Sequence, residues 1–411
     1  MQDQIDRRDM LKVGAVAFGA AGALATPALS EAKTQPVRYL TAKATNFIVA
    51  SSTSTGWTPD YTCDGVDDQV EIQQAIDALP TAGGSVVLTN GVFNISAPIN
   101  INKHNVQIYG VGAGQKQGAT HDAKGTRLEA STGLTGQMLK VQLTGNTQPV
   151  HGVILRDFTI DGKSLAGPID GILWRSYRGL LQNLHVFRFT GNGVDALGYA
   201  SWALYESFYT KLRIYECGAV GLFLDTDSTD GQVENCILGT NGINMKVAGG
   251  SMLVEQCHLF NPTTNNLVMV AGSRSKFSCC KIEGASEHGV ILDVTSNALT
   301  DVVFTGCGFA SNGKNTTQSN PPTVSYSHIK ATRSSGTQKV TRLNVGDCNF
   351  TTKTNDPKAD YFIDLGTDSS LLDDCLVDGV IFGATGTGAG PFTASMRKPA
   401  AEITIGTVVN G

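Results

Sequence analysis

Two aspartates and a lysine stand at comparable places in successive short apolar segments, and their side chains could do chemistry. Asp195 comes two residues after the glycine that opens its segment, whereas Asp225 and Lys246 come four residues after theirs. If the segments are strands of consecutive repeats, Asp195 and Asp225 lie one strand apart and two residues offset, with their carbons about 8 Å apart. Two carboxyl groups at this separation suit inverting hydrolysis of a glycosidic bond, in which one protonates the leaving oxygen and the other activates water.

Lys246 allows a second interpretation of the same residues. By the same count it lies beside Asp225, about 4.8 Å away, where an amine could act as the base of a β-elimination. An exposed ion pair between Asp225 and Lys246, which would contribute little to stability, explains the two residues equally well. The sequence leaves these alternatives open, and the candidate catalytic residues are Asp195, Asp225 and Lys246.

Basic and aromatic residues gather around these candidates. The stretch from 156 to 215 holds two of the three tryptophans, five of the ten tyrosines and seven Lys or Arg. Aromatic rings stack on sugar faces and cations pair with carboxylates, so such a patch suits an anionic glycan. Ordinary exposed side chains packed between repeats are the alternative. The candidate substrate-binding residues are Arg175, Arg178, Tyr199, Trp202, Phe223 and Asn244.

A metal role has weaker support. Residues 225–231 carry clustered oxygen donors that could bind Ca²⁺, but their spacing is not that of an EF-hand loop and no glutamate stands at its twelfth position. A plain turn explains the segment. We therefore assign no metal ligands, and Ca²⁺ is the only cofactor that stays open.

The elements that must position these residues belong to a repeat running from 155 to 377. A six-residue pattern recurs nine times: apolar, any, small polar, apolar or Cys, any, apolar. Strand-like spacing at intervals of 21 to 41 residues, without helical periodicity between copies, is typical of a coiled solenoid. We expect an all-β, right-handed parallel β-helix of about ten coils. The fourth positions of the pattern are Phe158, Leu184, Leu212, Cys236, Cys257, Cys280, Cys307, Cys348 and Cys375.

Two positions of the pattern carry specific predictions. The third is Asp, Asn or Gly in most copies, and these residues tolerate the left-handed backbone conformation of a sharp corner. The fourth should point inward, so that its six cysteines stack as one column of buried thiols about 4.8 Å apart. Small apolar filling explains such cysteines, whereas a redox or metal role lacks a C-x-x-C pair or a histidine partner. Their oxidation state stays open.

The ends of the chain differ from the repeat. Residues 1–32 resemble a twin-arginine export signal, with Arg7 and Arg8 before a weakly hydrophobic Ala/Gly stretch, which implies export to the periplasm or cell exterior. We predict strands and a linker at 33–66, the solenoid at 67–382 and a cap or tail at 383–411. A helix at 68–79, with Asp68 as N-cap and Glu71 completing a capping box, would cover the open end of the solenoid.

The entry to the solenoid resembles a known family. The run from Asp60 through the predicted helix to Gly110 is similar to the entry module of the pectate-lyase-like β-helix superfamily, and the later coils match only in general pattern. The resemblance implies a parallel β-helix and the activities of polysaccharide lyases, polygalacturonases, epimerases or tail-spike depolymerases. Glu287-His288-Gly289 matches only part of a polygalacturonase motif, and the other acidic clusters are missing. These departures put catalysis in doubt, since the fold also serves binding and structural proteins.

Composition narrows the function further. The net charge of −5 is mild and argues against a nucleic-acid partner. No apolar stretch after the signal is long enough to span a bilayer, so we expect no membrane partner once the signal is removed. Two functions remain: an exported lyase or glycoside hydrolase acting on an acidic polysaccharide, or a non-catalytic glycan-binding or structural β-helix such as an adhesin or tail spike. The oligomeric state is open, with a trimer among the options.

Overall fold

The computed structural model describes residues 45–114, 116–117, 120–121, 125–145, 148–198, 202–313, 326–353, 361–385, 396–398 and 403–410. The chain divides into two units, Met1–Ala42 and Lys43–Gly411, and all described residues belong to the second. The predicted export signal and the candidate residue Tyr199 lie outside the described residues.

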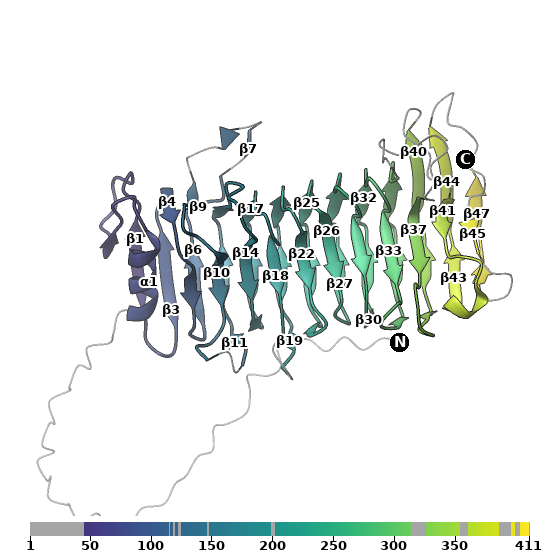
Figure 1. Ribbon diagram of the computed structural model, residues 1–411, viewed down its shortest axis with the longest axis horizontal. Helices are drawn as coiled ribbons and strands as arrows, with labels where there is room; N and C mark the ends of the chain where they lie inside the picture. The colour runs from purple at the N-terminus through teal and green to yellow at the C-terminus, as the bar shows by residue number, and fades with distance from the viewer. Residues whose placement is uncertain are drawn as a thin grey trace, which may run out of the picture. The chain divides into compact units, whose positions relative to one another are not determined.

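Three long parallel sheets form the solenoid (Figure 1). In spatial order, sheet A contains β2 (Tyr61–Thr62), β1 (Asn46–Ala50), β3 (Gly84–Leu88), β6 (Val106–Tyr109), β12 (Ile154–Arg156), β16 (Leu180–Gln182), β20 (Phe208–Thr210), β24 (Gln232–Glu234), β27 (Leu253–Glu255), β31 (Lys276–Ser278), β35 (Val303–Thr305), β39 (Asn344–Gly346), β43 (Cys375–Asp378) and β46 (Ile403–Ile405). Sheet B contains β4 (Gly91–Ile95), β9 (Thr126–Ala130), β13 (Thr159–Asp161), β17 (His185–Phe187), β21 (Arg213–Tyr215), β25 (Ile237–Gly239), β28 (His258–Phe260), β32 (Lys281–Glu283), β36 (Gly308–Ala310), β40 (Asn349–Lys353), β44 (Val380–Thr385) and β47 (Val408–Asn410).

Sheet C is the third layer. It contains β5 (Ile99–Ile101), β10 (Gly136–Val141), β14 (Ile169–Trp174), β18 (Val194–Ala196), β22 (Val220–Leu224), β26 (Ile243–Val247), β29 (Leu267–Met269), β33 (Val290–Asp293), β37 (Ser327–Thr332), β41 (Tyr361–Asp364) and β45 (Met396–Arg397). Short ladders pair β11 (Val150–His151) with β15 (Ser176–Tyr177), β19 (Leu204–Tyr205) with β23 (Ser228–Thr229), and β30 (Gly272–Ser273), β34 (Leu299–Thr300), β38 (Val340–Thr341) and β42 (Leu372–Asp373) in sequence. The antiparallel hairpin of β7 (Lys116–Gln117) and β8 (Thr120–His121) projects from an early coil, and the 3₁₀ helix η1 (Ser369–Leu371) lies in a late one.

The chain visits sheets A, B and C in turn. Strands β12, β13 and β14 form one coil, and β16 begins the next by pairing in parallel with β12. Alternate side chains point inward, and their buried apolar groups form one contiguous core from Val49 to Phe382. This arrangement confirms the predicted all-β parallel β-helix with about three short strands in each coil.

A two-residue corner joins sheet A to sheet B in each coil from β12–β13 to β39–β40, and its first residue has a positive φ. As predicted, φ is 63° at Asp157, 49° at Asn183 and 54° at Asn235. Lys211 and Gln256 adopt the same conformation, with φ of 55° and 52°, although long side chains do not favour it. The stacked coils therefore impose the corner even where the residue type does not.

Five cysteines form a buried column just after these corners. The thiol of each donates to a backbone carbonyl of the preceding coil at 3.3 to 3.6 Å. All nine cysteines of the chain are free thiols. Contact with Cys236 and burial raise the pKa of the Cys257 thiol, so it stays protonated, as a small apolar filler would. The column consists of Cys236, Cys257, Cys280, Cys307 and Cys348, none more than 2% exposed.

Cys375 was expected in this column, and that prediction is wrong. The pattern aligns Val345 with Leu372, but in the structure Val345 of β39 pairs with Val377 of β43. The true register is therefore shifted by five residues along the chain. The residue that follows Cys348 in the column is therefore Val380, because Ile381 N donates to the Cys348 carbonyl. Cys375 lies instead near the corner between sheets C and A. Both corners require a positive φ followed by an inward apolar residue, so a short pattern does not distinguish them.

A column of buried amides lies at the turns between sheets B and C. Asn244 Nδ2 donates to Asn266 Oδ1 at 2.7 Å, Asn266 Nδ2 donates to Asn312 Oδ1 at 3.0 Å, and Asn312 Nδ2 donates to His328 Nδ1 at 2.8 Å. All four side chains are fully buried. Asn244 also donates to the carbonyl of Phe260 at 3.0 Å, so it holds neighbouring coils together. The prediction that Asn244 contacts substrate is wrong.

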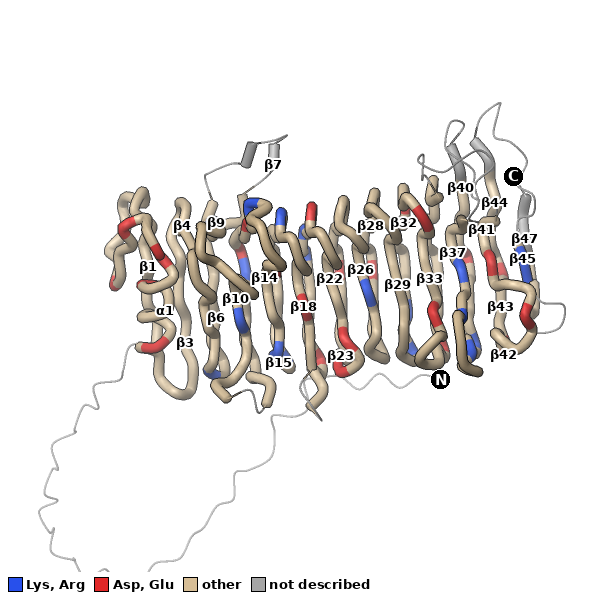
Figure 2. The backbone as a smooth tube through the Cα atoms, in the orientation of Figure 1, with Lys and Arg blue, Asp and Glu red and all other residues tan. Residues whose placement is uncertain are grey.

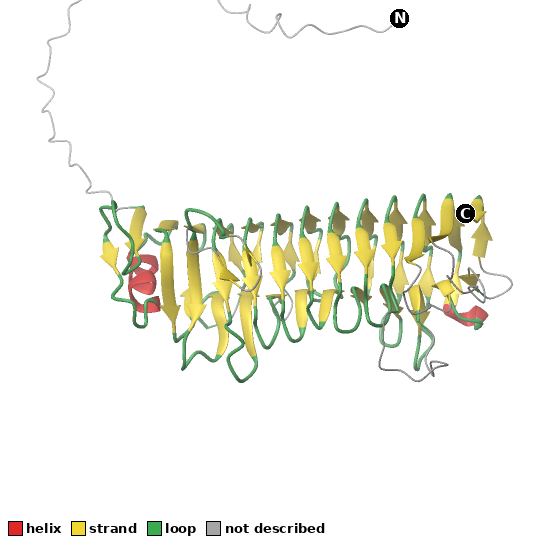
Figure 3. Cartoon of the chain, turned by 90° about the horizontal axis from the view of Figure 1, so that it is seen from above, coloured by secondary structure: helices red, strands yellow, loops and turns green. Residues whose placement is uncertain are grey.

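The helix expected at 68–79 is α1 (Gln69–Ala78), which lies at the N-terminal end of the solenoid (Figure 3). The predicted capping box does not form: Asp68 makes no side-chain cap bond to the helix. Its carboxylate accepts instead from Gly65 N at 2.8 Å and Asn94 N at 2.7 Å, which fastens the start of the helix to the first coil. The helix buries its apolar face over the open end of the core, as predicted, through Ile72, Ala75 and Ile76.

Asn266→Ala tests the contribution of the amide column. The substitution removes three hydrogen bonds and leaves buried partners unsatisfied, so it should lower the free energy of unfolding by roughly 2–4 kcal/mol. Urea unfolding followed by circular dichroism measures the change, with Asn297→Ala, at an exposed position, as the control. Equal stability of the two variants would show that the column does not hold the coils together.

Candidate functional site

One row of outward side chains crosses sheet C, and the strand pairing fixes its members. Leu173 pairs with Asp195, Asp195 with Phe223 and Phe223 with Lys246. We call these residues and their continuations the sheet C row. In order along the solenoid, it runs through Asn100, Lys140, Leu173, Asp195, Phe223, Lys246, Val268 and Ile291.

Asp195 lies in an apolar slot of this row. Its neighbours are Leu173, which is 5% exposed, and the half-buried ring of Phe223, and Asp195 itself is only 8% exposed. Its Oδ1 is buried without a hydrogen-bond partner among the described residues. Burial, and after it the charge of Asp170, raises the pKa of Asp195 to about 6. A carboxyl group with this environment can hold a proton close to neutral pH and give it up during a reaction.

Asp225 stands where the sequence predicted it relative to Asp195. It lies two residues beyond Phe223, which pairs with Asp195, so the two carboxyl groups are one strand apart and two residues offset. Standard spacings give about 8 Å between them. The charge of Asp225 contributes to the raised pKa of Asp195. Asp225 is more exposed than Asp195, and its Oδ1 accepts from Thr226 N at 2.7 Å, so the two carboxyl groups have different environments.

Asp170 is a third carboxylate of the site, and the sequence analysis missed it. Its Oδ1 accepts from Asn192 N at 2.6 Å and its Oδ2 from Gln137 Nε2 at 3.4 Å. After burial, its charge is the largest cause of the raised pKa of Asp195. Asp170 comes directly before Gly171, whereas the candidate residues were predicted at positions that follow such a glycine. An acidic residue directly before a strand-opening glycine was the signal that could have indicated it.

The expected contact between Lys246 and Asp225 does not form. Lys246 pairs with Phe223, and its Nζ lies 5.0 Å from the centroid of the Phe223 ring. The same register, continued by one residue beyond the pair of Leu224 and Val247, places Ala248 beside Asp225. The prediction assumed that Gly242 aligns with Gly221, the glycine that opens the preceding strand. In the structure Asn244 aligns with Gly221, so Lys246 pairs with Phe223 and not with Asp225.

The predicted substrate-binding residues separate into two groups. Arg175 stays near Asp195, since its charge acts to lower the pKa of Asp195, and its Nη1 donates to Gln142 Oε1 at 3.1 Å. Phe223 belongs to the sheet C row. Arg178 lies on another face: it pairs with Glu206 at 2.7 Å and lines a groove of about 530 Å³ on the outer face of sheet A. Trp202 is 50% exposed at the turn between sheets C and A.

A groove of about 660 Å³ opens on the same face as the sheet C row, at the N-terminal end. Its lining is mostly uncharged and polar, and includes Asn100 of the row and Gln142, which contacts Arg175. Helix α1 forms one wall through Gln73 and Asp77. The groove therefore extends the surface around Asp195 towards the helical cap.

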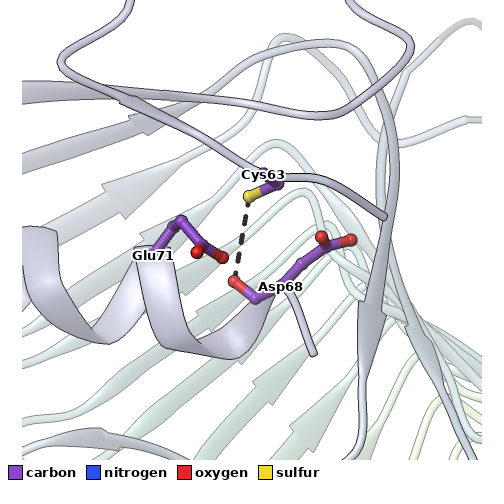
Figure 4. A group of neighbouring side chains, drawn as sticks. All are labelled: Cys63, Asp68 and Glu71. Atoms are coloured by element: carbon purple, nitrogen blue, oxygen red, sulfur yellow. Dashed lines mark hydrogen bonds between the residues drawn. The ribbon is translucent and has the colours of Figure 1, made fainter. Parts of the chain in front are cut away.

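One group of described residues could offer three ligand atoms to a metal ion (Figure 4): Cys63, Asp68 and Glu71, whose ligand atoms all lie within 4.8 Å of one another. Burial, and after it the charge of Asp68, raises the pKa of the Cys63 thiol well above its usual range. Because Asp68 fastens the cap through two backbone amides, the group has a structural explanation. Residues 225–231 form no such group among the described residues, so the Ca²⁺ hypothesis gains no support from the geometry.

None of the helices in the described ranges is long and apolar enough to cross a membrane.

Comparison with known proteins adds evidence on the fold. No protein-family model matches the chain, and no curated protein matches its sequence. The A-module of the mannuronan C-5 epimerase AlgE4 from Azotobacter vinelandii is similar in structure, with a TM-score of 0.62 and 15% identity over 88% of this chain and 95% of that chain.

Two further solved structures are similar. A double mutant of the tailspike protein of E. coli bacteriophage HK620 has a TM-score of 0.63 and 13% identity over 88% of this chain and 66% of that chain. DFA-IIIase from Arthrobacter chlorophenolicus A6 has a TM-score of 0.58 and 12% identity over 87% of this chain and 93% of that chain. At these identities the likeness shows the fold, a parallel β-helix.

The environment of Asp195 predicts a pH-dependent effect on stability. Its folded pKa is raised from 3.8 to about 6, so the folded protein binds this proton more tightly than the unfolded chain does. The favourable contribution is complete below the unfolded value and is lost as pH rises through the folded one. Asp195→Asn, which does not ionise, should therefore stabilise the protein at about pH 8, by up to roughly 3 kcal/mol, and have little effect near pH 4.

Urea unfolding of the wild type and Asp195→Asn at both pH values measures this effect. Asp293→Asn, a half-buried position on the same face of sheet C, is the control. An equal change in the free energy of unfolding at both pH values would contradict the raised pKa.

Proposed function

We propose that the protein is a polysaccharide-active enzyme that hydrolyses glycosidic bonds on the outer face of sheet C. The observation that carries this proposal is the buried carboxyl group of Asp195. Its Oδ1 has no hydrogen-bond partner in the part of the chain that the structure describes, and a second carboxyl group stands one strand and two residues away. Structures similar to this chain include a mannuronan epimerase, which supports a glycan as the ligand of such a β-helix.

In the proposed reaction, Asp195 is the general acid and Asp225 the general base. Asp195 holds a proton below about pH 6 and gives it to the glycosidic oxygen as the bond to the anomeric carbon breaks. Asp225 takes a proton from a water molecule, whose oxygen forms the new bond to that carbon. A separation of about 8 Å leaves room for the water, and the product has inverted configuration.

The neighbouring residues support this assignment of roles. Asp170 raises the pKa of Asp195 and so acts as a positioning residue that keeps the acid protonated. Phe223 offers an apolar surface beside the acid for the face of a sugar ring. Arg175 lies near the acid, since its charge acts on Asp195, and its guanidinium can donate hydrogen bonds to sugar hydroxyls. The groove at the N-terminal end of the same face would hold the continuing glycan.

β-Elimination with Lys246 as the base has less support. The ring of Phe223 lies between Lys246 and Asp195 in the sheet C row, and the ammonium group of Lys246 makes a cation–π contact with that ring. A lysine in this position can hold an anionic group of the substrate, but it is two strands from the acid. A non-catalytic glycan-binding β-helix is the second candidate function, and the exposed Trp202 favours it, since such rings bind sugars without any reaction.

Export through a signal at residues 1–32 is part of this proposal. Fractionation of cells that produce the full chain tests it, and protein confined to the cytoplasm with an intact N-terminus would contradict it.

Replacement of either carboxyl group should abolish most of the activity. On a polysaccharide that the wild type degrades, as found by a reducing-end screen of acidic and neutral polymers, Asp195→Asn and Asp225→Asn should each lower kcat by a factor on the order of 100 or more. Asp293→Asn should leave kcat unchanged. In the wild type, kcat/KM should fall as pH rises above about 6, because the acid loses its proton.

Full activity of Asp195→Asn would remove this residue from the mechanism. Ultraviolet absorbance of the products separates the two reaction types, since elimination creates a double bond and hydrolysis does not. Glycan binding by the wild type without any cleavage would favour the non-catalytic function.

A further inference from the structure

Two lysines flank Asp195 symmetrically in the sheet C row. Lys140 precedes Asp195 by two strands, with Leu173 between them, and Lys246 follows it by two strands, with Phe223 between them. In Figure 2 the strands β10 and β26 carry blue segments, and β18 between them carries a red one. Neither lysine forms an ion pair with an acidic residue that the structure describes.

The surface between the two lysines has the opposite character. Leu173 and the ring of Phe223 separate the lysines from Asp195. At the centre, the negative charges of Asp170 and Asp225 both act on Asp195. Arg175, whose positive charge acts on Asp195, also donates a hydrogen bond to Gln142. A negatively charged sugar at the centre would therefore be repelled, whereas one at either lysine would be attracted.

The spacing between strands gives the distance between Lys140 and Lys246 along the row. Four strand steps separate the two lysines, or about 19 Å at the usual spacing of parallel strands. A pyranose in an extended glycan advances the chain by roughly one such step. A chain that crosses the strands would thus place anionic groups about four sugars apart on the two lysines, with uncharged sugars between them.

From this pattern we propose that the substrate is a linear heteropolysaccharide whose anionic sugars are separated by uncharged ones, and not a polymer with a carboxylate on every sugar. The inference rests on the proposed function, because it takes Asp195 as the point of cleavage. The groove beyond Lys140 is lined mostly by uncharged residues, among them Asn100, Asn102 and Gln142, and its charged lining residue, Asp77, is acidic. This lining fits the same chemistry, since amides bind sugar hydroxyls and neither they nor Asp77 offer a counter-charge to a carboxylate.

Binding to two polymers of different charge density tests the proposal. The full-length Asp195→Asn variant is titrated calorimetrically with oligosaccharides of deacylated gellan, which carry one glucuronate in each tetrasaccharide repeat, and with oligogalacturonates of matched length. The gellan oligosaccharides should bind tighter by a factor on the order of ten or more. Equal or tighter binding of oligogalacturonate, or binding of neither, overturns the proposal.

Lysine variants test the role of the flanking charges. In the same Asp195→Asn background, Lys140→Met and Lys246→Met keep the apolar stem and remove the charge. Each should weaken gellan binding by on the order of tenfold and reduce its dependence on salt. Lys276→Met, at an exposed position on sheet A, is the matched control and should bind like its parent. Unchanged affinity and salt dependence in both row variants overturns the proposal.

The outcomes separate this inference from the proposed function. Cleavage of polygalacturonate by the wild type, lost in Asp195→Asn, would uphold hydrolysis at Asp195 and overturn the spaced-charge substrate. Preferential gellan binding that depends on both lysines, without cleavage of any polymer by the wild type, would uphold the spaced-charge ligand and overturn hydrolysis.

Discussion

Every strand of this solenoid depends on the strand above and the strand below for its backbone hydrogen bonds. A parallel strand with an unpaired edge exposes a row of N–H and C=O groups, so each coil is stable only in register with its neighbours. That register places the same position of every coil in one column. The thiols from Cys236 to Cys348 and the amides from Asn244 to Asn312 are two inward consequences, and the sheet C row is an outward one. At the N-terminal end of the described solenoid, α1 covers the core.

The same constraint creates the chemistry of the candidate site. Stacking places Asp195 between Leu173 and Phe223 whether or not a carboxyl group favours that environment. The side chains of an inward polar column can form hydrogen bonds with one another, as the amides do. Asp195, in contrast, has one oxygen without a hydrogen-bond partner among the residues that the structure describes. Its ionised form is therefore destabilised, and Asp170 and Asp225 add like charge. A buried carboxyl group whose pKa is pushed towards neutrality by burial and by like charges is the kind of group that is found at functional sites.

Local chemistry allowed much of the fold to be predicted from sequence. Asp157, Asn183 and Asn235 indicated the corners because few residue types tolerate a positive φ, and the spacing between corners indicated a solenoid. Register was harder to predict, because it is set by pairing between coils of unequal length. Asn244 stands where a glycine was expected at the start of the strand. As a result, Lys246 was predicted beside Asp225, whereas it pairs with Phe223, two residues earlier. Cys375 meets the local pattern at a different corner. The sequence predicted the relative position of Asp195 and Asp225 correctly. The proximity of Asp170 to Asp195 depends on how consecutive coils stack, and the local sequence does not show it.

The protonation of Asp195 in the substrate-free protein is the most direct test of this site. The aspartate carboxyl carbons can be labelled with ¹³C and followed by NMR as pH is varied, with Asp195→Asn identifying the signal. The structure predicts a midpoint near pH 6, which moves down when Asp170 is replaced by Asn because the like charge is lost. A midpoint near 4 that is insensitive to Asp170 would mean that Asp195 is an ordinary exposed carboxylate, and the proposed acid would be lost.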